Sequence, residues 1–155
     1  TGPMKDEVRL LKTFILANDI YGSEIAKQGV SGYVTEVLIC KFESFQNVVK
    51  ALANFEKNQM IGRSQKNFDT PMIIIDPIDS NRNLGTAIST ENVGKLILAC
   101  RAFLLKPSIS FFKTKKASLS SKKNLENCFV GLRNFLSLNS FFITEVFIDS
   151  KCVLD

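Results

Sequence analysis

The sequence contains no histidine, and this absence narrows the chemistry that the chain can perform. Without an imidazole it has no Ser-His-Asp triad, no histidine general base and no histidine ligand for a metal. Its four cysteines are widely scattered and form no CxxC pair, so a zinc site is not expected. Most of them have apolar neighbours, and we therefore predict buried free thiols at Cys40, Cys100, Cys128 and Cys152.

Long apolar runs are also missing. No stretch approaches the roughly 20 apolar residues that span a bilayer, and the start of the chain, TGPMKDEVRL, has no signal-peptide core. We therefore expect a cytoplasmic protein without a membrane partner. The hydrophobic content of 45% is typical of a globular protein, and 155 residues suggest one domain with a piece of a second. A net charge of +5 is compatible with a nucleic-acid partner but does not establish one.

The first third of the chain predicts three helices. The first covers residues 6–18, and its apolar positions recur at the spacing of one helix face. A glycine-punctuated connection, residues 19–32, follows. Ser31 and Ser44 are suitable N-caps for the second and third helices, because a serine side chain accepts a hydrogen bond from the first turn. The buried stripe of the first helix is expected at Leu10, Leu11, Phe14 and Ile15.

The middle of the chain predicts a short strand between two polar stretches. Residues 56–70 are polar and lack regular periodicity, whereas residues 72–75 form a short, fully apolar run that is typical of a buried strand. After a polar loop, Ser89 or Thr90 is expected to cap a fourth helix. Four predicted helices and one short strand up to this point predict a mainly α fold.

The last third is less regular. Residues 113–123, KTKKASLSSKK, are typical of a solvated boundary, with Phe111 and Phe112 just before it. Aromatic rings beside cations can stack on RNA, but adjacent phenylalanines cannot share a face, so at least one should belong to the core. A fifth helix is predicted near 123–138 and a strand near 141–148. The fold prediction is thus a four- or five-helix bundle with short β segments.

The loop that follows the central strand is the first candidate site. In DPIDSNRN, Pro77 fixes its own φ angle and pushes Asp76 into an extended conformation, which ends the strand. The Asp, Ser and Asn side chains favour side-chain-to-backbone turns that stiffen the loop. Arg82 then becomes a cation on a rigid support, and its planar fork suits a phosphate or a base edge. A plain surface turn is the ordinary alternative. Asp76 and Asp79 are predicted to be turn-forming residues and not metal ligands, because nothing nearby supplies further acidic ligands in a suitable pattern.

Two cations and a phenol near the N-terminus form the second candidate site. Arg9 and Lys12 share one face of the predicted helix, and Tyr21 follows just beyond it. These groups can together hold an anion such as a triphosphate. The segment Gly29–Leu38 adds a helix start whose backbone N–H groups can face phosphate. The alternatives are a solvated helix face and an ordinary capped helix in which Tyr33 is half buried.

Four segments occur in a fixed order between residues 6 and 113: DEVRLLKTFILANDIYGSEI, QGVSGYVTEVLICKFESFQNVV, DPIDSNRNLGTAIS and PSISFFK. In order and spacing this set resembles the central region of the archaeal-type, class I CCA-adding enzymes, which are tRNA nucleotidyltransferases. The resemblance implies a helical domain of the poly(A) polymerase and oligoadenylate-synthetase substrate-binding type. It also implies a domain over residues 6–112, with residues 1–5 as a linker or added remnant and 113–155 as a linker and the start of the next domain.

By position, the resemblance implies that Lys12 and Tyr21 contact the triphosphate of incoming CTP or ATP. Arg82 would help to recognise the base together with the tRNA backbone, and Arg9 and Asn83 are possible nucleotide or tRNA contacts. The implied partners are the tRNA acceptor end, CTP or ATP, and a nucleotidyltransferase head domain in the same chain or in a separate subunit. The implied function is to complete the nucleotide pocket and to support the 3′ end of the tRNA during CCA addition.

The catalytic carboxylates of such enzymes are not found in this sequence, which has no Asp-x-Asp pair. Mg²⁺ is therefore expected only through a head domain, with no metal ligand and no catalytic residue in this chain. By itself the chain is expected to be inactive in nucleotidyl transfer. One alternative remains open: a non-catalytic RNA-binding or scaffold module that keeps the fold. An unrelated helical interaction domain would require the four matching segments to be a coincidence, and we discount it.

Overall fold

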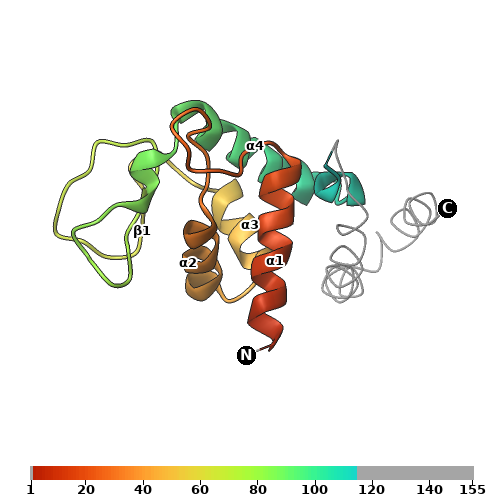
Figure 1. Cartoon of the computed structure of the whole chain (residues 1–155), viewed down its shortest axis with the longest axis horizontal. Coiled ribbons are helices and arrows are strands. Elements are labelled where there is room, and N and C mark those ends of the chain that lie inside the picture. The colour runs from red at the N-terminus through yellow and green to blue at the C-terminus, as the bar shows by residue number, and fades with distance from the viewer. Residues whose placement is uncertain (1, 115–155) are drawn as a thin grey trace.

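The computed structural model describes residues 2–114 and is mainly helical, as predicted (Figure 1). Four α-helices surround one core, and a loop region projects from them on the left of the figure. The predicted helix at 123–138 and strand at 141–148 lie outside the described residues. In chain order the elements are α1 (Gly2–Ala17), α2 (Gly32–Phe42), α3 (Phe45–Ala53), β1 (Met60–Ile61), β2 (Ile73–Ile74), the 3-10 helix η1 (Leu84–Ala87), α4 (Thr90–Leu105) and the 3-10 helix η2 (Ile109–Phe112).

Helix α1 begins four residues before the predicted start at residue 6. Residues 2–5, which the domain prediction sets apart from residues 6–112, form its first turn. Pro3 is compatible with this position, because the backbone N–H groups of a first helical turn have no partner within the helix. The buried stripe is the predicted one: Leu10, Leu11, Phe14 and Ile15.

Serine side chains cap the other three α-helices at the predicted places. The hydroxyls of Ser31, Ser44 and Ser89 each accept a hydrogen bond of 3.2 Å from the backbone N–H three residues later. Each of these hydroxyls satisfies one of the N–H groups that a helix start leaves unpaired. Of the two predicted caps for α4, Ser89 is therefore the one that the structure uses.

A cluster of five phenylalanines holds α1, α3, α4 and η2 together. Phe14 lies at its centre, with its ring centroid 5.5–6.1 Å from the other four. Most of these ring pairs adopt edge or tilted arrangements, which suit the quadrupoles of aromatic rings. Phe112 is buried and Phe111 is partly buried, which confirms that at least one of this pair is core. The members of the cluster are Phe14, Phe45, Phe103, Phe111 and Phe112.

The predicted strand near 72–75 is present as β2, and its partner was missed. Met60 pairs with Ile73 and Ile61 with Ile74 in a parallel ladder. Strand β1 lies within the polar stretch 56–70, and two residues are too few to produce a periodic pattern. The pairing joins two segments of the projecting loop region to each other (Figure 1).

The cysteine prediction is correct at one described position and wrong at another. Cys100 is buried, and this burial raises the pKa of its thiol to about 12. Cys40 is exposed, because it lies on the outward face of α2 together with Tyr33 and Glu36. Cys128 and Cys152 lie outside the described residues. Among the helices that the structure describes, none has the length and apolar character needed to cross a membrane.

Candidate functional site

Lys12 and Tyr21, predicted from separate segments, meet at the first residue of α2. A Cβ atom placed on Gly32 would lie 3.1 Å from the Tyr21 hydroxyl oxygen and 3.6 Å from the Lys12 Nζ. The hydroxyl and the ammonium therefore both lie against the backbone of Gly32. A side chain at this position would displace them, so glycine allows both groups to approach the helix start.

The connection between α1 and α2 brings Tyr21 to this place. Tyr21 and Val30 form an isolated parallel bridge, so the connection folds back on itself. Gly29 is required at the crossing point, because a Cβ atom there would lie only 2.1 Å from the carbonyl oxygen of Ile20. Glycine at position 29 therefore allows two backbone segments of the connection to lie in close contact beside the site.

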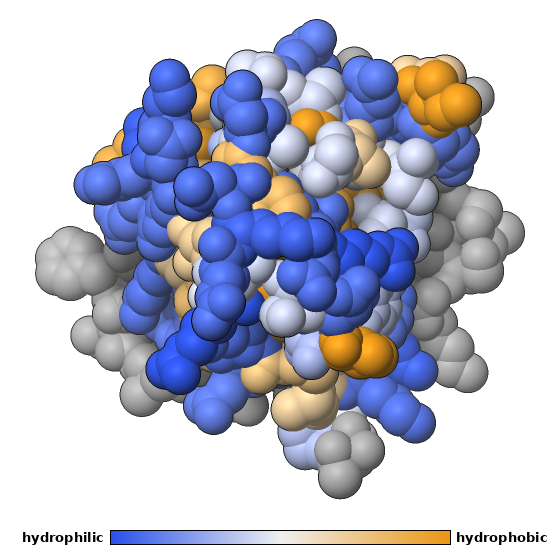
Figure 2. Space-filling view, turned by 90° about the vertical axis from the view of Figure 1, so that its left-hand side faces the viewer, coloured by the Kyte–Doolittle hydropathy of each residue, from blue (hydrophilic) through white to orange (hydrophobic). Residues whose placement is uncertain are grey.

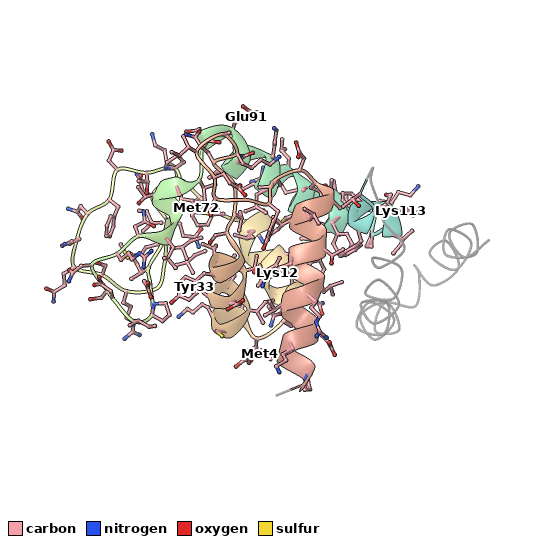
Figure 3. All side chains as sticks on the ribbon, in the orientation of Figure 1. Met4, Lys12, Tyr33, Met72, Glu91 and Lys113 are labelled. Carbon is pink, nitrogen blue, oxygen red and sulfur yellow. The ribbon has the colours of Figure 1, made fainter. Side chains whose placement is uncertain are left out.

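Lys12 is oriented by an acidic partner on the neighbouring helix. Its Nζ lies 3.0 Å from Oε1 of Glu36, one turn beyond Gly32 on α2. The Lys12 side chain is 34% exposed, so an anionic ligand can reach the ammonium. The labelled Lys12 in Figure 3 lies between α1 and α2. An ammonium, a phenol hydroxyl and the positive end of a helix at one point form an arrangement that can bind an anion.

The loop that carries Arg82 is held closed by its own hydrogen bonds. The backbone N–H of Asp76 donates to the carbonyl of Arg82 at 3.0 Å, and the N–H of Arg82 donates to the carbonyl of Asp79, also at 3.0 Å. Oδ1 of Asp79 accepts from the N–H of Asn81 at 2.9 Å. Asp76 and Asp79 are therefore turn-forming residues, as predicted. The Arg82 side chain is 66% exposed, which leaves its guanidinium accessible from solvent.

Tyr33, which the sequence interpretation treated only as a helix residue, links this loop to α2. Its hydroxyl donates to Oδ1 of Asp76 at 3.0 Å, while Oδ2 of Asp76 lies 3.6 Å from Nη1 of Arg82. Tyr33 directly follows Gly32, so the first turn of α2 contacts both groups of predicted residues. In Figure 3, Tyr33 lies on the side of α2 that faces the projecting loops.

These contacts also set the protonation states of Asp76 and Tyr33. The backbone N–H of Ile78, followed by the Tyr33 hydroxyl and the Arg82 charge, lowers the pKa of Asp76 below its ordinary value. The hydrogen bond to Asp76 is the main cause that raises the pKa of Tyr33. At neutral pH the carboxylate is therefore ionised and the phenol keeps its proton, which is the state that the hydrogen bond requires.

The two weaker predictions have different surroundings. Asn83 is buried: its Oδ1 accepts from the N–H groups of Ile74 and Gly85, both at 2.9 Å, and its Nδ2 donates to Oγ1 of Thr70 at 2.7 Å. Its amide therefore holds the loop and strand β2 together. Arg9 is exposed, and its Nη1 lies 3.0 Å from Oδ1 of Asp6, one turn earlier on α1. A contact of Asn83 or Arg9 with the nucleotide or the tRNA remains a prediction.

A cavity of about 530 Å³ lies elsewhere, between residues 55–58, which follow α3, residues 69–71 and the first half of α4. Lys12, Tyr21 and Arg82 do not line it. Within residues 2–114, no group of three or more Asp, Glu or Cys side chains is arranged to hold a metal ion.

The fold and the site together define a helical domain in which the start of α2 lies between Lys12 and Tyr21 on one side and a loop that carries an arginine on the other. The family described as tRNA nucleotidyltransferase, second domain, matches residues 6–113, and the chain belongs to this family. The resemblance found in the sequence motifs is thereby confirmed.

Several curated relatives are named CCA-adding enzyme. The protein from Picrophilus torridus is 40% identical over 116 residues, which are 74% of this chain and 27% of that protein. The one from Sulfurisphaera tokodaii is 42% identical over 114 residues, 72% of this chain and 28% of that protein. The one from Methanocaldococcus jannaschii is 37% identical over 146 residues, 86% of this chain and 32% of that protein. The chain therefore spans about a quarter to a third of the length of these relatives.

Proposed function

We propose that this chain supplies the second domain of a CCA-adding tRNA nucleotidyltransferase, where it closes one side of the pocket for incoming CTP or ATP and supports the tRNA 3′ end. One observation carries the proposal: the first turn of α2 contacts Lys12 and Tyr21 through Gly32, and the Arg82 loop through Tyr33. Two groups that suit opposite ends of a nucleotide are thus attached to one rigid element. The family membership supports the same function.

In this proposal the triphosphate lies at the start of α2. The Lys12 ammonium exchanges Glu36 for a phosphate oxygen, and the Tyr21 hydroxyl donates to a second one. The base lies toward Arg82, whose guanidinium presents several N–H groups in one plane and can contact base edges and tRNA phosphates. A head domain completes the pocket and supplies the carboxylates for Mg²⁺, so residues 2–114 alone bind and orient without transferring a nucleotide.

The proposal is tested in a chimera in which residues 6–113 replace the matched domain of the Picrophilus torridus enzyme. We expect the chimera to add CCA to a tRNA that lacks it. Arg82→Ala should lower the rate and weaken the choice of CTP and ATP over UTP and GTP. The fold should persist, because the hydrogen bonds from the Tyr33 hydroxyl and the Ile78 N–H still hold the Asp76 carboxylate that loses its ion-pair partner. Incorporation of both CMP and AMP by the variant at the unchanged rate and selectivity would contradict the role of Arg82, and an inactive chimera would contradict the domain assignment.

A second prediction concerns Gly32. Alanine at this position places a methyl group 3.1 Å from the Tyr21 hydroxyl, which must move by a few tenths of an ångström, together with Lys12. We expect the Michaelis constant for CTP to rise roughly tenfold, equivalent to about 1.4 kcal/mol of lost binding. Folding stability should be unchanged or slightly higher, because alanine favours the helix more than glycine does.

Gly94→Ala is the matched control for this substitution. Gly94 also lies in a helix, and a Cβ atom there meets no atom within 4 Å. The control should gain the same helix stabilisation while the Michaelis constant for CTP stays at its original value. Equal Michaelis constants in the two variants would show that no ligand group lies at Gly32.

A further inference from the structure

The Asp76 carboxylate is buried, whereas both side chains that it contacts reach the surface. The Asp76 side chain is 4% exposed, compared with 66% for the Arg82 side chain and 39% for Tyr33. The buried, ionised Asp76 carboxylate thus contacts two accessible side chains from different segments: Arg82 on the loop and Tyr33 on helix α2. Figure 2 shows the side of the molecule on which the projecting loops lie, and this face is mostly hydrophilic.

The contacts of Asp76 exceed what the turn needs. The hydrogen bond from the Ile78 N–H, at 2.9 Å, is the local contact that closes an Asp-Pro turn. The hydrogen bond from Tyr33 joins Asp76 to a residue 43 positions earlier, and the ion pair joins it to Arg82, six positions later. A buried carboxylate is stable only when it is hydrogen-bonded and paired, so Arg82 and Asp76 restrict each other.

We propose that Tyr33 and Asp76 are positioning residues that fix the Arg82 guanidinium and thereby set the nucleotide selectivity of the site. The selectivity part rests on the proposed function. Tyr33 adds a connection that the loop alone lacks: it joins the guanidinium to the same helical turn that contacts Lys12 and Tyr21. The distance between the phosphate-binding side chains and the base-binding guanidinium is then set by the Tyr33 hydroxyl and the Asp76 carboxylate.

The positioning part is tested on the complete 155-residue chain by NMR, without any nucleotide. The chain has five arginines, and the Nε–Hε signal of Arg82 is assigned by its loss in Arg82→Lys. Tyr33→Phe removes the hydroxyl, and Asp76→Asn removes the charge while an amide oxygen can still accept from Tyr33 and Ile78. In both variants we expect the Arg82 Nε signal to shift and its heteronuclear Overhauser effect to fall, because the guanidinium becomes mobile.

Tyr21→Phe is the matched control, since it removes the other tyrosine hydroxyl of the chain, one that does not contact Asp76 in the structure. It should leave the Arg82 signal unchanged. Backbone spectra of all three variants report whether the fold persists. An Arg82 Nε signal that is equally ordered in the original chain and in both Tyr33→Phe and Asp76→Asn would overturn the positioning role, whatever the activity.

The selectivity part is tested in the chimeric enzyme. For Tyr33→Phe and Asp76→Asn we expect the ratio of kcat/KM for CTP to that for UTP to fall roughly tenfold, about 1.4 kcal/mol of lost discrimination. The Michaelis constant for pyrophosphate in the reverse reaction should stay the same, because both variants retain Lys12 and Tyr21, the proposed phosphate-binding side chains at Gly32. An unchanged ratio would overturn the selectivity role. An inactive chimera with the original residues would instead overturn the proposed function, while the NMR result still decides the positioning.

Discussion

Replacement of Phe14 by alanine is expected to lower the free energy of unfolding by about 3–5 kcal/mol. Phe14 is fully buried, and its ring lies at the centre of the cluster formed by Phe45, Phe103, Phe111 and Phe112. Alanine removes the contacts with all four rings and leaves a cavity that packed neighbours from α1, α3, α4 and η2 cannot fill. Unfolding in urea, followed by circular dichroism, measures the change.

Leu16→Ala on the same helix is the control for Phe14→Ala. Leu16 is 52% exposed, so the loss of its side chain should change the free energy of unfolding by less than about 1 kcal/mol. Both variants change helix propensity very little compared with the packing difference. Similar losses for the two substitutions would mean that the phenylalanine cluster does not stabilise the domain as the structure indicates.

Asn83→Ala should destabilise the site loop by about 2–5 kcal/mol although no ligand is present. The substitution leaves the buried N–H groups of Ile74 and Gly85 without their acceptor, and each unsatisfied group costs roughly 1–3 kcal/mol. It also removes the Nδ2 donor to the Thr70 hydroxyl, which keeps its own hydrogen bond to the carbonyl of Met72. Hydrogen exchange of the Ile74 and Gly85 amides reports the local effect, and urea unfolding reports the total.

Asn81 offers a matched asparagine in the same loop. It is exposed, and its backbone N–H, which alanine retains, makes the contact with Asp79. Asn81→Ala should therefore change the free energy of unfolding by less than about 0.5 kcal/mol. If Asn83→Ala proves as mild as Asn81→Ala, the loop is held by other contacts, and direct ligand contact becomes the better interpretation of Asn83.

The candidate residues were found from the sequence to different degrees. Arg82 was recognisable because proline, aspartate and asparagine in one loop predict a rigid turn by local chemistry alone. Tyr33 was missed because its partner, Asp76, is 43 residues away, and no local pattern encodes a hydrogen bond at that separation. For the same reason the sequence did not distinguish Asn83, a buried structural amide, from its exposed neighbours.

The sequence by itself determined the helices, their serine caps, the buried stripe of α1 and the family. These features follow from short-range periodicity, from hydrogen bonds within a few residues and from motifs in a fixed order. Only the tertiary structure decided that Gly32 lies against Lys12 and Tyr21, and that Tyr33 joins Asp76 to the same helical turn. Those contacts depend on how α1, α2 and the loop pack on a shared core, and packing is a property of all the contacting segments at once.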